Sequence, residues 1–176
     1  MNIISIGYLG FETAKIDEWR EYGPQVMGFQ IANSPESDPE SLYFKMDDRR
    51  HRMAFHPGEI ERVSYIGWET RNRLDFIDAV KTLDEHKVEY SVGDVQLCET
   101  RGVKELVRFR DPVGYQHELF YAQKWTPRSF TPGRPHGGFK CDERGVGHLV
   151  LMTPEFTPEL EHFLIEIMGM QGYGWG

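Results

Sequence analysis

The chain of 176 residues has few cysteines and no long apolar run. Cys98 and Cys141 are too few for a disulfide framework and lack the spacing of metal ligands, which indicates a reducing compartment. No apolar stretch approaches the roughly 18 residues that span a bilayer, and the first residues do not resemble a signal peptide. We therefore expect a cytoplasmic protein without a membrane partner.

Basic residues are outnumbered by acidic ones, 20 against 28, so the formal net charge is −8. The longest mixed basic run, residues 47–52, includes two aspartates. Such a charge balance lacks the positive surface that binds nucleic acid. It favours an acidic enzyme or a small-molecule-binding protein.

A short motif occurs three times, beginning at Tyr8, Tyr65 and His148. In each copy a residue with a ring is followed by an aliphatic residue, a small or aliphatic residue, a large apolar residue, a variable residue and a threonine. A repeat of this kind indicates a duplicated supersecondary unit. The third copy differs in that a histidine replaces the tyrosine.

The residues after the first two motifs predict an α+β fold of two tandem βαβββ modules that together form one domain, residues 1–60 and 61–123. In the first module, a helix over 16–22 should stop at Gly23-Pro24. In the second, Asn72 should cap a helix whose apolar residues are Leu74, Ile77, Val80 and Leu83. A short helix or turn over 95–101 should precede the last two strands.

Residues 124–145 are rich in Pro, Gly and charge and predict a linker. The third motif should then open a further module, residues 146–176, with a strand over 147–153 and a helix capped by Thr157. Met168-Gly169 repeats Met27-Gly28 of the first module. Because a lone strand and helix cannot bury their apolar face, we expect a truncated form of a longer protein.

Histidines are the candidate metal ligands. On a strand, His148 would share a face with Val150 and Met152. Its imidazole would either bind a metal or form a partly buried, hydrogen-bonded side chain. His51 and His56 are predicted to face opposite sides of one strand and to occupy a solvated edge.

Several stretches together resemble the type I extradiol ring-cleaving dioxygenases of the vicinal oxygen chelate, or glyoxalase-like, superfamily. The likeness is greatest to the 2,3-dihydroxybiphenyl and 1,2-dihydroxynaphthalene enzymes. It covers nearly the whole chain but only the N-terminal portion of such an enzyme. The matching stretches are Gly7-Tyr8-Leu9-Gly10, His51-Arg52-Met53-Ala54, Tyr65-Ile66-Gly67-Trp68, Asp111-Pro112-Val113-Gly114 and Gly145-Val146-Gly147-His148-Leu149-Val150.

The resemblance implies meta-cleavage of a bicyclic catechol by O₂, in the degradation of aromatic compounds. The family's metal, Fe(II) or sometimes Mn(II), is held by two histidines and a glutamate of the second domain. The first ligand matches His148, and the other two would lie beyond Gly176. Val150 matches a position that lines the substrate pocket, with ordinary core packing as the alternative. The chain alone should bind no metal and be inactive.

The internal alignment places Tyr8 and Tyr65 at the histidine positions of this first domain. The resemblance implies that Glu118, in the last strand of the second module, matches the glutamate of the family's second domain. Phenols with a pKa near 10 are poor Fe(II) ligands, so we interpret the three residues as a vestigial non-metal site.

Two other readings stay open. One is a non-catalytic binding protein like the bleomycin-resistance proteins, which hold a ligand between paired modules. The other is a homo-oligomer in which subunits exchange the C-terminal strand and helix to complete a site.

Overall fold

The computed structural model describes residues 1–172, except for the side chain of Asp142. The first module contains β1 (Ile3–Thr13), α1 (Ile16–Tyr22), β2 (Gln30–Ala32), β3 (Leu42–Lys45) and β4 (Met53–Pro57). The second contains β5 (Arg62–Thr70), α2 (Arg73–Glu85), β6 (Tyr90–Val92), α3 (Val95–Arg101), β7 (Glu105–Arg110) and β8 (Gln116–Tyr121). The predicted order of elements is confirmed, including the short helix before β7.

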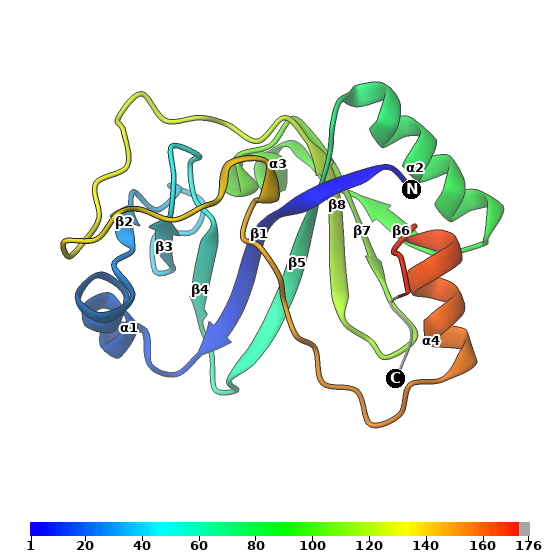
Figure 1. Ribbon diagram of the computed structural model, residues 1–176, viewed down its shortest axis with the longest axis horizontal. Coiled ribbons are helices and arrows are strands. Elements are labelled where there is room, and N and C mark those ends of the chain that lie inside the picture. The colour runs from blue at the N-terminus through cyan, green and yellow to red at the C-terminus, as the bar shows by residue number, and fades with distance from the viewer. Residues whose placement is uncertain (173–176) are drawn as a thin grey trace.

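The eight strands form one curved sheet in the order β2-β3-β4-β1-β5-β8-β7-β6 (Figure 1). β1 and β5 pair antiparallel at its centre, β1 pairs parallel with β4, and β5 pairs parallel with β8. The two halves of the sheet therefore repeat the same strand arrangement, as expected for duplicated modules. The fold is α+β, with α1 near one end of the sheet and α2 near the other.

Helix α2 begins where the sequence predicts. The Asn72 Oδ1 atom accepts hydrogen bonds from the backbone N–H groups of Leu74 (2.8 Å) and Asp75 (3.0 Å). Such a cap satisfies two donors that otherwise lack partners at a helix start. The predicted apolar face is confirmed at Ile77, Val80 and Leu83, which pack on the core, and is wrong at Leu74, which is 73% exposed in the first turn. The fully buried residues of α2 are Phe76, Ala79 and Leu83.

Helix α1 ends at Tyr22, before Gly23-Pro24, as predicted, but the helical backbone does not stop there. The chain continues as a π-helical turn over Gly23–Met27 and ends at Gly28, whose φ is +81°. Pro24 has no N–H group to donate to the preceding turn, and the helix changes from α to π geometry at this point.

The third copy repeats this arrangement. Helix α4 (Pro158–His162) runs into a π-helical turn over Phe163–Ile167, and the left-handed position follows at Gly169, whose φ is +73°. The repeated Met-Gly pair therefore marks a left-handed turn in both copies, a conformation that glycine adopts without steric cost.

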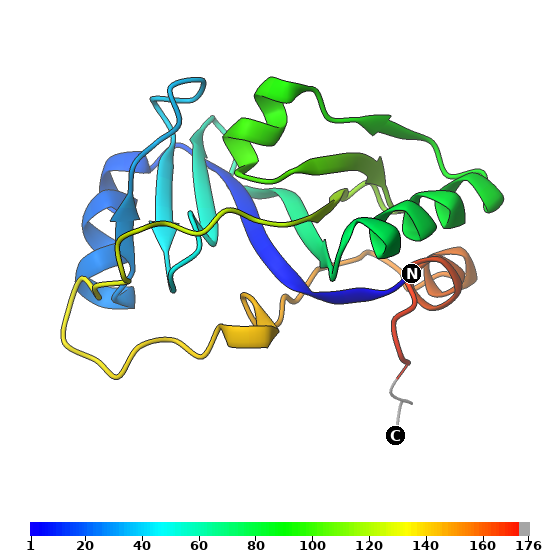
Figure 2. The ribbon, with the colours of Figure 1, turned by 90° about the horizontal axis from the view of Figure 1, so that it is seen from above.

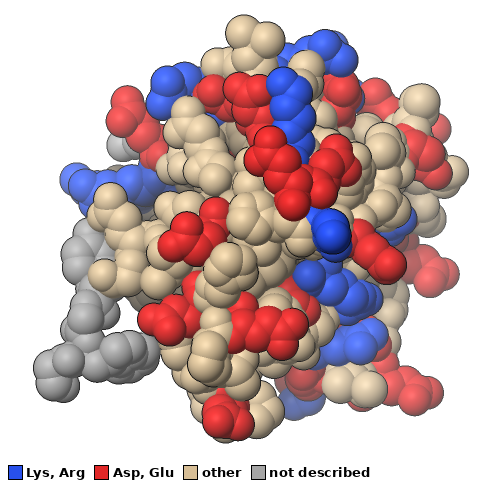
Figure 3. Space-filling view, turned by 90° about the vertical axis from the view of Figure 1, so that its right-hand side faces the viewer, with Lys and Arg blue, Asp and Glu red and all other residues tan. Residues whose placement is uncertain are grey.

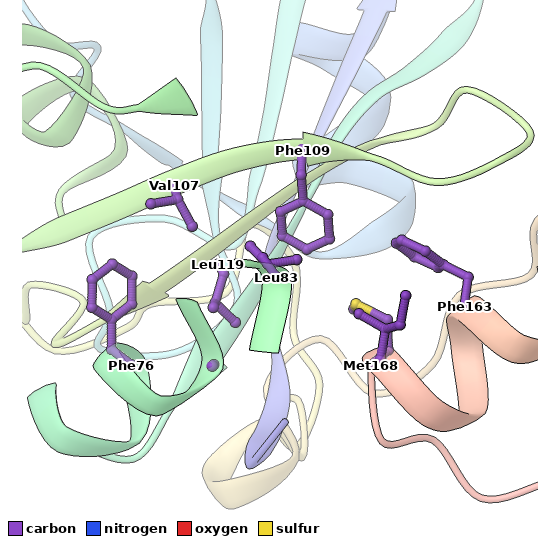
Figure 4. Close-up of a cluster of buried hydrophobic side chains, with 9 residues drawn as sticks. Phe76, Leu83, Val107, Phe109, Leu119, Phe163 and Met168 are labelled. Carbon is purple, nitrogen blue, oxygen red and sulfur yellow. The ribbon is translucent and has the colours of Figure 1, made fainter. Parts of the chain in front are cut away.

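The predicted cap of this helix is confirmed, because the Thr157 Oγ1 atom accepts a hydrogen bond from the Leu160 N–H at 3.2 Å. Figure 4 shows Phe163 and Met168 turned toward Phe109 and Leu119 of the sheet. The helix of the third copy thus packs on the second module, beside α2.

Residues 124–145 lie along the first module and return toward β1 (Figure 2). The Gly133 N–H donates to the Gly28 carbonyl oxygen (3.2 Å), and Lys45 Nζ donates to Thr126 Oγ1 (2.8 Å). Cys141 is buried in an apolar cluster with Phe29. This segment therefore packs against the first module at several points.

The face that carries α2 and α4 shows acidic and basic side chains interspersed rather than a continuous basic patch (Figure 3). Among residues 1–172, no helix is both long enough and apolar enough to cross a lipid bilayer.

Candidate functional site

Two tyrosines of the repeated motif meet at the centre of the sheet. In the register of β1 and β5, Tyr8 lies opposite Gly67 and Tyr65 lies opposite Gly10. A Cβ atom added at Gly67 would stand 2.3 Å from the Tyr8 ring, and one added at Gly10 would stand 2.2 Å from the Tyr65 ring. Each glycine of the motif therefore makes room for the ring of the other copy.

Glu118 of β8 joins these rings. The Tyr8 Oη atom donates to Glu118 Oε2 at 2.7 Å. Arg101, at the end of α3, donates from Nε to Oε2 (2.9 Å) and from Nη2 to Oε1 (3.1 Å). Tyr8 and Glu118 are 0% and 1% exposed, so both carboxylate oxygens are engaged in a dry interior.

Arg101 also contacts the second tyrosine. Its guanidinium carbon lies 3.7 Å from the centre of the Tyr65 ring, a cation–π contact. The Tyr65 hydroxyl is 2.8 Å from His56 Nε2. Sequence reasoning missed Arg101, because no local pattern predicts that the last residue of α3 reaches a carboxylate on β8.

His56 continues this chain of hydrogen bonds toward the surface. Its Nδ1 atom lies 2.7 Å from Ser41 Oγ and 3.2 Å from Asp38 Oδ2. Ser41 Oγ itself donates to Asp38 Oδ1 (2.7 Å), so it accepts the Nδ1–H of His56, and Nε2 then accepts from Tyr65. The neutral Nδ1–H tautomer of His56 satisfies every bond of the chain.

The predicted solvated edge at His51 and His56 is wrong. His51 is 1% exposed, and the side chain of His56 is 21% exposed. Both imidazole rings contact Tyr43, at centroid distances of 5.0 and 6.2 Å. The prediction placed both histidines on one strand, but β4 begins only at Met53. His51 therefore lies in the preceding loop and does not follow the alternation of side chains along the strand.

The interior donor set does not fit Fe(II). Burial and the charge of Glu118 raise the pKa of Tyr8 well above its usual value, and burial raises the pKa of Tyr65. Both phenols therefore stay protonated, while Arg101 and Tyr8 occupy the oxygens of Glu118. No cluster of three or more His, Cys, Asp or Glu in the described part of the chain has the arrangement of metal ligands. That Tyr8, Tyr65 and Glu118 are a vestigial counterpart of a metal centre stays a prediction.

His148 lies elsewhere, on an extended segment that forms no strand. The predicted strand over 147–153 is wrong, because no strand of the described chain pairs with this backbone. The predicted alternation of inward and outward side chains is nevertheless present. Leu149 and Leu151 pack against an apolar cluster of β1 and β5, whereas His148 is exposed. The segment is held at its far end by Tyr115, whose Oη atom donates to the Met152 carbonyl oxygen at 2.7 Å.

Val150 shares the outward face of His148. It is 75% exposed and Met152 is 80% exposed. Core packing, one of the two readings of Val150, therefore does not hold in this structure. The outward face presents an imidazole followed by two apolar side chains, and the structure does not bring His148 together with Tyr8, Tyr65 or Glu118.

Comparison with known proteins agrees with this architecture. The family model described as dihydroxybiphenyl dioxygenase BphC D1 matches residues 6–58. An iron-dependent extradiol dioxygenase of Rhodococcus jostii (strain RHA1) is 33% identical over 171 residues, which cover 97% of this chain and 56% of that relative. A biphenyl-2,3-diol 1,2-dioxygenase of Paraburkholderia xenovorans (strain LB400) is 30% identical over 172 residues, with the same two coverages.

Among solved structures, BphC, a halotolerant catechol dioxygenase, superimposes with a TM-score of 0.88 and 35% identity, over 95% of this chain and 55% of that one. The chain thus spans a little over half the length of the proteins it matches. Fold, motifs and sequence identity agree, and the chain belongs to the extradiol ring-cleaving dioxygenases of the vicinal oxygen chelate fold.

Proposed function

We propose that this chain is the amino-terminal part of an iron-dependent extradiol dioxygenase that opens the ring of a bicyclic catechol such as biphenyl-2,3-diol with O₂. Support comes from the relative that is named iron-dependent and from the one named for biphenyl-2,3-diol. A cytoplasmic location and degradation of aromatic compounds are part of the same proposal.

The observation that carries this proposal is the position of His148. Its imidazole stands outside the packed interior, next to the exposed side chains of Val150 and Met152. One imidazole does not hold Fe(II) in an ordered geometry, since such sites use two histidines and a carboxylate. His148 is therefore proposed as one ligand, with the other two supplied by sequence outside this chain, and Val150 as a wall of the substrate pocket.

The alternative of a binding protein without metal has less support. In that reading a ligand would lie between the paired modules. The space between them is filled by Tyr8, Tyr65 and Arg101, and Tyr8 and Glu118 are buried almost completely.

The test compares two proteins: this chain alone, and the same chain extended along its source reading frame. Each is loaded anaerobically with Fe(II), mixed with biphenyl-2,3-diol and exposed to air, and the yellow ring-opened product and O₂ uptake are followed. We expect turnover only from the extended protein. Turnover by the chain of 176 residues would instead support exchange of the C-terminal segment between subunits, which light scattering at increasing concentration would reveal as a homo-oligomer.

A further inference from the structure

We propose that His86 and His162 form a two-histidine site for a divalent transition-metal ion, such as zinc, that links α4 to α2. His86 is the residue that ends α2, and His162 is the last residue of α4. Both side chains are exposed and line one open groove of about 840 Å³ between the helices and the sheet. The site is separate from His148 and does not depend on the proposed function.

The geometry of the two rings carries the proposal. Their centroids are 5.6 Å apart and their planes are inclined by 56°, so the rings are neighbours that are tilted and not stacked. With a zinc–nitrogen bond of about 2.1 Å, the centre of each bound imidazole lies about 3.2 Å from the ion. Two such imidazoles at a tetrahedral angle have centres about 5.2 Å apart. The observed separation of 5.6 Å exceeds that distance by about 0.4 Å.

The surroundings of the pair favour a cation. His86 lies at the C-terminal end of a helix of 13 residues, where the backbone carbonyl groups give a partial negative charge. Glu159, one turn before His162, lines the same groove, as does Glu89. Three cations, Lys87, Arg108 and Arg110, line the same groove and oppose the binding of a metal ion. Imidazole nitrogen is a ligand that Zn²⁺, Cu²⁺ and Ni²⁺ accept readily.

The site would supply two protein ligands and leave the other coordination positions to water or to a small chelating molecule in the groove. Its effect would be on the packing of α4. This helix is held to the second module by Phe163, Ile167 and Met168. An ion shared by His86 and His162 would bind only when α4 is docked, and so would stabilise the docked state.

The experiment uses the untagged chain and zinc alone. Zinc is titrated while the imidazole signals are followed by NMR, and the thermal unfolding midpoint is measured with and without the ion. We expect the signals of His86 and His162 to shift together and saturate at one equivalent, with a rise in the midpoint. His86→Ala and His162→Ala should each lose that rise, and both should fold because the two side chains are exposed. His148→Ala, at an exposed histidine elsewhere, should keep it.

Three results would overturn the proposal. One is the absence of any zinc effect on the wild-type chain. The second is a midpoint rise that survives in either His86→Ala or His162→Ala. The third is a zinc effect that is lost in His148→Ala.

Discussion

The Tyr8 hydroxyl donates to Glu118 Oε2 over 2.7 Å and thereby joins the first strand of one module to the last strand of the other. Arg101 holds the same carboxylate through two nitrogens. The glutamate that the sequence predicts to match a metal ligand of the second domain therefore binds a guanidinium and a phenol. Glu118 and Arg101 therefore form a buried, structural ion pair in the interior of the two modules.

Replacing Glu118 by glutamine should destabilise the chain strongly. The substitution leaves the Arg101 guanidinium buried without a counter-charge, a change that costs about 3–5 kcal/mol in free energy of unfolding. Urea unfolding followed by circular dichroism measures it. The matched control is Glu105→Gln, which removes an ion pair with Arg73 whose side chains are 41% and 60% exposed and should cost about 0–1 kcal/mol. Equal losses in the two variants would contradict the assignment of a buried pair.

The glycines opposite the two tyrosines should not tolerate a methyl group. Gly67→Ala places a Cβ atom against the Tyr8 ring and should lower the free energy of unfolding by about 1–3 kcal/mol through overpacking. Gly10→Ala should do the same through Tyr65. As a control, Gly137→Ala meets no atom within 4 Å and should leave the unfolding midpoint nearly unchanged. A neutral Gly67→Ala variant would show that the register of β1 and β5 differs from the one described.

His51 should make the chain less stable in mild acid. Burial, followed by the charges of Arg101 and Arg50, holds the pKa of His51 well below its usual 6.5. Neither ring nitrogen has a hydrogen-bond partner among the protein groups described. The unfolded chain therefore binds a proton at His51 that the folded chain does not, so stability falls as the pH decreases below about 6.5.

Unfolding of wild type and His51→Phe at pH 7.5 and pH 5.5 tests this. The wild type should lose up to about 1.4 kcal/mol per pH unit more than the variant in that window. His56 and Asp38, which contact Tyr43, are present in both proteins, so the comparison isolates the part of the pH dependence that requires His51. Identical pH dependence of the two proteins would exclude His51 as the cause.

Features that depend on neighbouring residues were predictable from the sequence. The Asn72 and Thr157 caps follow from side chains that bond the next turn of backbone. The grouping of Tyr8 with Glu118 rests on the internal repeat for the tyrosine and on the family resemblance for the glutamate.

Features that depend on distant partners were not predictable. The segment after Gly147 alternates like a strand, yet a strand also needs a neighbour with free backbone groups, and none pairs with it in the described chain. Arg101, the last residue of α3, reaches Glu118 of β8 across 17 residues of sequence. His51 was assigned to the wrong environment because its loop departs from the alternation that starts at Met53.

Iron loading of the extended protein tests the central claim most directly. Wild type, His148→Ala and Met152→Ala are each incubated with Fe(II) under anaerobic conditions, desalted and analysed for metal. Met152→Ala is the matched control, because Met152 lies on the same exposed face. Retention of iron by wild type and Met152→Ala, with loss of most iron in His148→Ala, is the predicted result. Full iron retention by His148→Ala would contradict the assignment of this histidine as a metal ligand.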